Sequence, residues 1–160
     1  MKPRLFCGVD PGLGGAIGFV DEAGAFAAVV DMPTLPTSTG RRQLDPSGLA
    51  EIMRRYDPAF TLVERVGPRP GEGASSAFAF GWVFGGLLAT LGALALPHGT
   101  ISPATWKRRA GIPPRALKCI SIATAKAALP TSAPYLARVK DDGRAEALLL
   151  AIQCWQSRTH

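Results

Sequence analysis

The segment FCGVDPGLGGAIG, residues 6–18, places a carboxylate at the end of an apolar run and follows it with glycines. The apolar residues predict a buried strand over residues 5–10, which Pro11 and Gly12 interrupt just after Asp10. Four glycines fall within residues 12–18. A backbone without side chains lets a bulky ligand approach closely. We therefore expect a ligand-binding site at this strand end, with Asp10 as part of it.

The rest of the pattern predicts an α/β fold with a mixed sheet in one domain, residues 1–160. Short turns join the first three strands, which therefore form an antiparallel meander. A helix capped by Asp45 then returns the chain, so that the fourth strand runs parallel to the first. Residues 33–46 are expected to form a polar loop. The predicted strands cover residues 5–10, 15–24, 25–33, 59–66 and a short segment from 99. The predicted helices cover 45–56, a long apolar segment after 76, a basic segment ending at 109, 114–129 and 141–156.

Basic residues are concentrated in the last third of the chain. The whole chain of 160 residues has a net charge of +6, whereas residues 101–160 alone carry +7. This distribution favours a nucleic-acid or phosphate-binding face, although a solvated helix surface has a similar composition. The candidate DNA-binding residues are Lys107, Arg108, Lys118, Lys140 and, in a Gly/Pro-rich loop over residues 67–76, Arg69.

The three cysteines, Cys7, Cys119 and Cys154, are widely spaced and form no C-x-x-C pair. This spacing is typical of free thiols in a reducing compartment rather than of a zinc site or a disulfide framework. The apolar run at the N-terminus is also too short for a signal peptide. We therefore expect a cytoplasmic protein.

Residues 77–96 are uncharged and long enough to span a bilayer. The alternative is a helix buried by the core on one side and by a second subunit on the other. Gly81 and Gly85 favour this alternative, because glycines destabilise a helix unless another surface approaches closely. We expect a homodimer formed through this helix, and no membrane span.

Acidic side chains are predicted to meet at one edge of the sheet. Asp10 and Glu64 end two parallel strands, and Asp142 and Glu146 share one face of the last helix. Clustered carboxylates repel one another unless a divalent cation neutralises them, and Mg²⁺ prefers such oxygen ligands. Two ions would suit an in-line phosphoryl displacement. Taken singly, each acid also fits a plainer role, as a helix cap, a turn residue or a solvated strand end.

These segments together resemble the RuvC family of Holliday-junction resolvases, in the RNase H-like superfamily. The resemblance covers nearly the whole chain and is nearest to the phage and organelle-type branch. It is carried by GVDPGLGGAIGFVD, LVERV, GEGASSAFAFGWVFGGLLATLGAL, ISPATWKRRAGIP and KDDGRAEALLLA. It implies an RNase H-like fold with a five-stranded mixed sheet flanked by helices. It also implies a homodimer that cuts four-way DNA junctions with two symmetric nicks, in recombination and repair, using Mg²⁺ or Mn²⁺.

Within this resemblance, Asp10 and Glu64 match the first two catalytic acids, and Glu146 falls where the last acid is expected. The family's closing pair lies three residues apart, but position 143 here is glycine. The remaining metal ligand is therefore Asp142, with Asp141 as the alternative.

The resemblance also bears on the loop and the start of the apolar helix. Arg69 would probe the junction centre. Phe78 or Phe80 would either wedge between bases or, as composition favours, pack in the core.

Two other functions use similar motifs. A nucleotide-binding phosphotransferase of the sugar-kinase and actin type also begins with this strand and turn, but such proteins need two domains of this kind. A catalytically silent DNA-binding relative is disfavoured because all four acid positions are filled.

Overall fold

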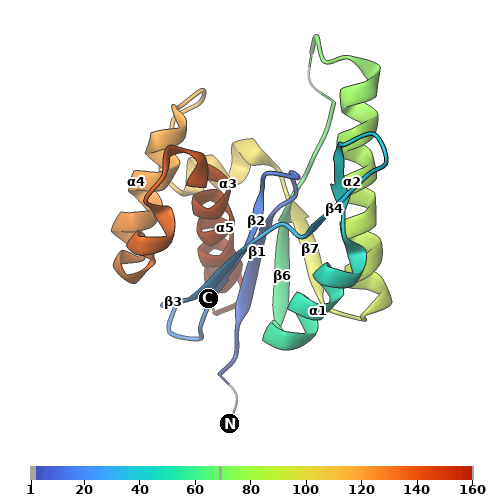
Figure 1. Ribbon diagram of the computed structural model, residues 1–160. Coiled ribbons are helices and arrows are strands. Elements are labelled where there is room, and N and C mark those ends of the chain that lie inside the picture. The colour runs from blue at the N-terminus through green and yellow to red at the C-terminus, as the bar shows by residue number, and fades with distance from the viewer. Residues whose placement is uncertain (1–2, 69, 160) are drawn as a thin grey trace.

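A five-stranded sheet lies between two layers of helices in the computed structural model, which describes residues 3–68 and 70–159 (Figure 1). The strand order is β3-β2-β1-β6-β7; β1, β2 and β3 are antiparallel neighbours, and β6 and β7 run parallel to β1. This confirms the predicted mixed sheet. The strands are β1 (Phe6–Asp10), β2 (Ala16–Val20), β3 (Phe26–Asp31), β6 (Phe60–Glu64) and β7 (His98–Ile101).

The helices divide between the two faces of the sheet, each with its own apolar cluster (Figure 1). Helices α1 (Pro46–Tyr56) and α2 (Ala74–Ala93) cover one face, where Leu49, Val83 and Leu87 pack against Val9 and Phe19. The other face is covered by α5 (Asp142–Thr159), with α3 (Pro103–Arg109) and α4 (Lys118–Ala128) beside it.

Helix α5 lies directly on β1 and β2 because two strand positions carry glycine. A Cβ atom at Gly8 would collide with the backbone of Ala147 and Ala151, and one at Gly18 would lie 2.8 Å from the carbonyl carbon of Ala147. Any larger side chain at either position would push the helix off the sheet. The two glycines therefore set the depth at which α5, and every residue on it, meets the strands.

This packing corrects part of the expectation for the glycines that follow Asp10. A Cβ at Gly15 would collide with the carbonyl oxygen of Asp10, so Gly15 is required by the tight turn and Gly18 by α5. Of the four glycines, Gly14 borders open space in the described chain, and a Cβ at Gly12 would make only ordinary contacts, none nearer than 3.6 Å. Close packing therefore accounts for Gly15 and Gly18, and ligand access remains the expected reason for Gly12 and Gly14.

The predicted polar loop over residues 33–46 contains a small hairpin of β4 (Thr34–Pro36) and β5 (Arg42–Leu44), paired from Thr34↔Leu44 to Pro36↔Arg42. The loop prediction was wrong here because the buried side chain of Leu44 anchors the segment to the core cluster beneath α2. The polar composition of the segment gave no indication that Leu44 packs in the core.

Helix α4 begins at Lys118 rather than at residue 114 as predicted. The preceding Pro113 and Pro114 lack N–H donors, and Arg115 has a left-handed backbone with φ of 59°. Short 3₁₀ segments, Pro130–Leu136 and Val139–Asp141, then lead to α5, which starts at Asp142. The chain therefore reaches the beginning of α5 through a series of tight turns.

Helix α2 has one buried face and one open face. Val83, Leu87 and Leu91, spaced four apart, are buried in the core, as predicted for one side of the helix. On the other side Phe78 is 70% exposed and Trp82 64% exposed, and the two rings contact each other. The expectation that Phe78 packs in the core was therefore wrong. By length and composition α2 alone among the helices of the described chain could cross a membrane, and only 17% of its apolar window is buried in the structure.

Candidate active site

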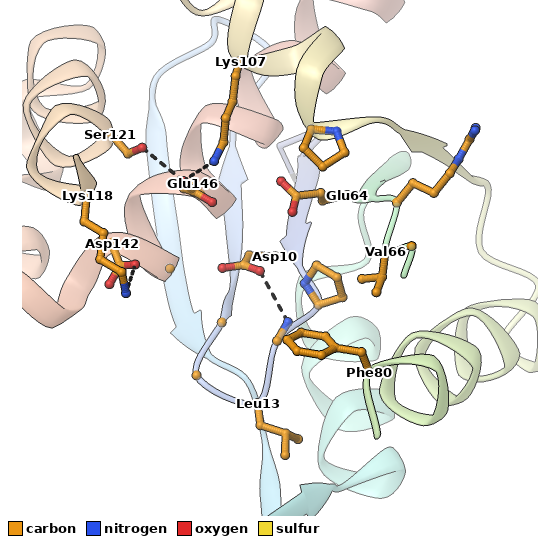
Figure 2. A pocket seen from close by; sticks show the side chains of 18 of the residues that line it. Asp10, Leu13, Glu64, Val66, Phe80, Lys107, Lys118, Ser121, Asp142 and Glu146 are labelled. Atoms are coloured by element: carbon orange, nitrogen blue, oxygen red, sulfur yellow. Dashed lines mark hydrogen bonds and ion pairs between the residues drawn. The ribbon is translucent and has the colours of Figure 1, made fainter. Parts of the chain in front are cut away.

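The ends of β1 and β6 open into a pocket of about 830 Å³ (Figure 2). Asp10, Glu64, Asp142 and Glu146 all line it, so the four acids predicted from the sequence come from three separate elements to one place. Val9 of β1 lies opposite Val63 of the parallel strand β6, and this register brings the next residues of both strands, the two acids, to the same edge. The predicted juxtaposition is therefore present.

Asp10 is the most perturbed of these acids. Its carboxylate is partly buried and accepts a long hydrogen bond of 3.4 Å from the backbone N–H of Gly12. Burial, followed by the charges of Glu64 and Glu146, raises the pKa of Asp10 to about 7. A carboxyl group in this state binds either a proton or a cation at neutral pH.

Glu64 is held by a residue that sequence reasoning missed. The indole Nε1 of Trp106 donates a hydrogen bond of 2.6 Å to Glu64 Oε2. Trp106 is buried on α3, a short helix capped by Ser102 that begins directly after β7. An indole N–H only donates, so it fixes one carboxylate oxygen as its acceptor. The sequence did contain a signal for this contact, a tryptophan one turn into a predicted helix that follows a strand. A buried indole N–H needs an acceptor, and the acids at the strand ends are nearby acceptors.

The two acids of α5 are paired with lysines (Figure 2). Lys118 Nζ lies 2.8 Å from Asp142 Oδ2, and Lys107 Nζ lies 2.9 Å from Glu146 Oε1. Ser121, also missed from the sequence, donates a hydrogen bond of 3.1 Å to the same oxygen of Glu146. Two of the four carboxylates are thus neutralised by side chains of the protein itself.

Asp141, the alternative metal ligand, does not line the pocket in the described chain. Its carboxylate is only 2% exposed and accepts hydrogen bonds from the backbone N–H of Arg138 at 2.8 Å and from the guanidinium of Arg138 at 2.6 Å. This interaction lowers the pKa of Asp141. Asp141 closes the 3₁₀ turn before α5 and is held there by Arg138, whereas Asp142 lines the pocket, and this placement favours Asp142 as the ligand.

The donor set fits a hard divalent cation, because carboxylate oxygens are the ligands that Mg²⁺ and Mn²⁺ prefer. As the side chains stand, however, no three acidic, histidine or cysteine groups in the described residues are gathered closely enough to hold an ion. Lys107 and Lys118 hold Glu146 and Asp142, while Trp106 holds Glu64. The four acids therefore form a site in which lysine ammonium groups supply part of the positive charge.

The predicted DNA-binding residues divide by position. Lys107 and Lys118 line the pocket, whereas Arg108 and Lys140 are exposed and do not line it in the described part of the chain. Arg69 lies outside the described residues. Two further basic residues line the pocket, Arg65 and Arg115. Arg115 belongs to the basic last third of the chain that was expected to contact phosphates, whereas Arg65 was not singled out from the sequence. The sequence signal for Arg65 was its position directly after Glu64.

No protein-family model and no curated protein matches this sequence. Among solved structures, it is similar to RuvC of T. thermophilus in complex with a Holliday junction substrate, with a TM-score of 0.68 and 19% identity over 98% of this chain and 96% of that chain. Another structure, of Thermus thermophilus RuvC, aligns with a TM-score of 0.59 and 18% identity over the same shares of both chains. The yeast mitochondrial Holliday junction resolvase Ydc2 aligns with a TM-score of 0.53 and 13% identity over 98% of this chain and 80% of that chain.

The fold is RuvC-like. At these identities the similarity concerns the fold, and it confirms at that level the resemblance found in the motifs. The geometry also explains the glycine at position 143. A Cβ there would lie 2.7 Å from the carbonyl oxygen of Gly14 and 3.2 Å from Asp10 Oδ2. A side chain at residue 143 would collide with the backbone of the Gly14–Gly15 turn, which accounts for the glycine at this position, whereas Asp142 lines the pocket.

Proposed function

We propose that this protein is a metal-dependent endonuclease that resolves four-way DNA junctions by paired symmetric nicks, in recombination or repair. The observation that carries the proposal is the convergence of Asp10, Glu64, Asp142 and Glu146 on one pocket of a RuvC-like fold. The similar RuvC of T. thermophilus is in complex with a Holliday junction substrate, which supports branched DNA as the substrate class here.

The four acids would hold Mg²⁺ or Mn²⁺, most simply two ions. When bound, such ions supply Lewis-acid activation of the phosphodiester and a hydroxide nucleophile. The protein contributes orientation. Trp106 donates a hydrogen bond to Oε2 of Glu64, and Ser121 donates one to Oε1 of Glu146, so both carboxylates are held in a defined orientation toward the pocket.

Lys107 and Lys118 have a second role in this proposal. Their ammonium groups neutralise Glu146 and Asp142 in the structure, and the same groups line the pocket that would receive the DNA backbone. Ammonium groups bind phosphate oxygens as point charges. Cation binding by the acids would free both lysines for phosphate.

We also propose that α2 joins two copies of the chain. The open face of α2 combines the exposed rings of Phe78 and Trp82 with Gly81 and Gly85, and nothing in the described chain lies within 4 Å of a Cβ built at either glycine. An apolar helix face with small residues fits a second copy of itself about a two-fold axis. Two pockets related by that axis would suit two opposed nicks.

A synthetic four-way junction labelled on each strand in turn tests the function. We expect nicks at symmetric positions on two strands in the presence of Mg²⁺ or Mn²⁺, none with EDTA, and little cleavage of a linear duplex of the same sequence. Junction binding without any cleavage would instead indicate a silent DNA-binding protein. Absence of both binding and cleavage would refute the proposal.

A further inference from the structure

Four basic residues of the described chain line the pocket, and they fall into two chemical groups. The lysines, Lys107 and Lys118, are bound to carboxylates of α5. The arginines, Arg65 and Arg115, form no ion pair with any carboxylate among the described residues. The pocket therefore contains two exposed guanidinium groups that pair with no carboxylate of the described residues, although five acidic residues line the same pocket.

Hydrogen bonds hold Arg65 in position, although its guanidinium pairs with no carboxylate of the described residues. Its backbone N–H donates to the carbonyl of Ile101 at 2.8 Å, which extends the β6–β7 ladder past Glu64. Its Nε and Nη2 lie 3.4 and 3.3 Å from Thr100 Oγ1 on β7. A neutral hydroxyl orients the guanidinium without neutralising it. A guanidinium held in this way is suited to bind a phosphate through two parallel hydrogen bonds.

Arg115 lies on a different wall, in the turn between α3 and α4. It follows two prolines and has a left-handed backbone with φ of 59°, a conformation that side-chain-bearing residues rarely adopt. Strained residues of this kind persist where the surrounding structure holds them, and they are frequent at ligand-binding sites. The turn keeps Arg115 exposed at the edge of the pocket, three residues before Lys118.

We infer that Arg65 and Arg115 bind the phosphates on either side of the one that is cut. The DNA strand would then cross the pocket from the β6–β7 edge to the turn before α4, over the four acids. This inference rests on the proposed nuclease function and adds the path of the strand to it. Without cations the lysines stay paired with the acids, and the arginines alone bind the flanking backbone.

The first test measures junction binding in EDTA, so that cleavage and metal binding do not contribute. We expect Arg65→Gln and Arg115→Gln each to weaken binding roughly tenfold at 0.1 M salt and to reduce the slope of log K against log salt by about 1, and the double variant by about 2. Arg54→Gln is the matched control, because Arg54 is an exposed arginine in the last turn of α1, before the opposite end of β6. The control should bind like the wild type.

The second test locates the phosphates. In junctions that carry one neutral methylphosphonate, the penalty of Arg65→Gln should vanish at one position on one side of the cut, and that of Arg115→Gln at one position on the other side. Thr100→Val should weaken binding less than Arg65→Gln, since it removes only the orienting hydroxyl, and it should leave the salt slope unchanged.

The outcomes separate this inference from the proposed function. If the wild-type protein cuts the junction but both arginine variants keep the wild-type salt slope, the inference is wrong and the nuclease function stands. If both penalties vanish at the same phosphate, or at none, the strand path is wrong. If the wild-type protein neither binds nor cuts the junction, the proposed function itself fails.

Discussion

Glycines serve opposite purposes on the two faces of the sheet. On the α5 face they belong to the strands, where Gly8 and Gly18 lie against the backbone of α5 with no room for a methyl group. On the α2 face they belong to the helix, where Gly81 and Gly85 border open space in the described chain. Contacts within one chain thus cover the α5 face of the sheet, whereas no described residue packs against the outer face of α2 at these two glycines.

The difference separates two tasks of the molecule. The closed face positions the acids, because α5 carries Asp142 and Glu146 and cannot shift without distorting Asp10 and its loop. The open helix is free of charge from Ala74 to Ala93 and carries none of the four acids. We therefore expect changes on the α5 face to alter folding and chemistry, and changes on the outer face of α2 to alter assembly.

The largest expected effect comes from filling the closed face. Gly8→Ala places a methyl group inside the backbone of α5 and should lower the free energy of unfolding by at least about 3 kcal/mol. Gly92→Ala is the matched change on α2, where a Cβ meets nothing in the described chain within 4 Å. It should change stability by ~1 kcal/mol or less, in the stabilising direction that helix propensity predicts. Urea unfolding measures both, and similar losses in the two variants would refute the contrast.

Substitution of the four acids should have the next largest effect, and this effect should be on cleavage activity rather than on folding. Asp10→Asn, Glu64→Gln, Asp142→Asn and Glu146→Gln should each reduce cleavage by roughly a thousandfold or more, because the site loses a metal-holding carboxylate. Binding should persist or tighten, since less negative charge faces the phosphates. Asp141→Asn is the control. It should keep cleavage but lower the melting temperature, because Arg138 loses its buried partner. Normal nicking by Asp10→Asn would overturn the site.

The acids and the sheet could be predicted because local signals agreed with the tertiary arrangement. Strand ends, a helical crossover and the four-residue spacing of Asp142 and Glu146 all pointed to one edge. The choice between Asp141 and Asp142 could not be predicted, since it depends on the 3₁₀ turn and on the capture of Asp141 by Arg138.

The partners of the acids were also beyond sequence reasoning. Trp106 lies 42 residues from Glu64 in the chain, and Ser121 lies 25 residues from Glu146. Such contacts follow from how α3 and α4 pack beside α5, which periodicity does not report. The ion pairs of Lys107 and Lys118 with the acids were missed for the same reason, because the basic residues were interpreted as a DNA-binding face or a solvated surface and not as partners of the acids.

A bulky residue on the open face tests the assembly. Gly85→Leu should prevent the close approach of a second α2 and convert a dimer into a monomer or an aggregate, as measured by sedimentation at micromolar concentration. A folded Gly85→Leu monomer should nick one strand of a junction without coordinating the second nick. A wild-type protein that is a stable monomer, or one that is extracted only with detergent, would contradict the proposed dimer.

The closed face also predicts a pH-dependent stability. The pKa of Asp10 is raised to about 7, above its ordinary 3.8, so the folded state holds a proton that the unfolded chain has released. Without divalent cations, stability should therefore fall as pH rises from about 4 to 7. Asp10→Asn removes this penalty and should stabilise the protein by roughly 4 kcal/mol at pH 8, with no gain below pH 4.

Divalent cations supply the complementary measurement. Mn²⁺ should stabilise the wild-type protein at pH 8 and leave Asp10→Asn nearly unchanged, because binding to the folded state alone raises stability. Thermal unfolding at the two pH values, with and without Mn²⁺, measures both effects. An equal gain for Asp10→Asn at pH 4 and pH 8 would show that the charge of Asp10 is not the cause.

The smallest effect concerns a single phosphate contact beside α5. Lys118 is exposed and lies next to Asp142, so it should contact DNA once that acid binds a cation. In Ca²⁺, a hard cation that also binds carboxylate oxygens, Lys118→Ala should reduce the slope of log K against log salt by about 1. Lys118→Arg keeps the charge and should keep the slope. If Lys118→Ala also leaves the slope unchanged, the ammonium group of Lys118 serves only to neutralise Asp142, and the phosphate contacts proposed for the pocket would rest on Lys107, Arg65 and Arg115.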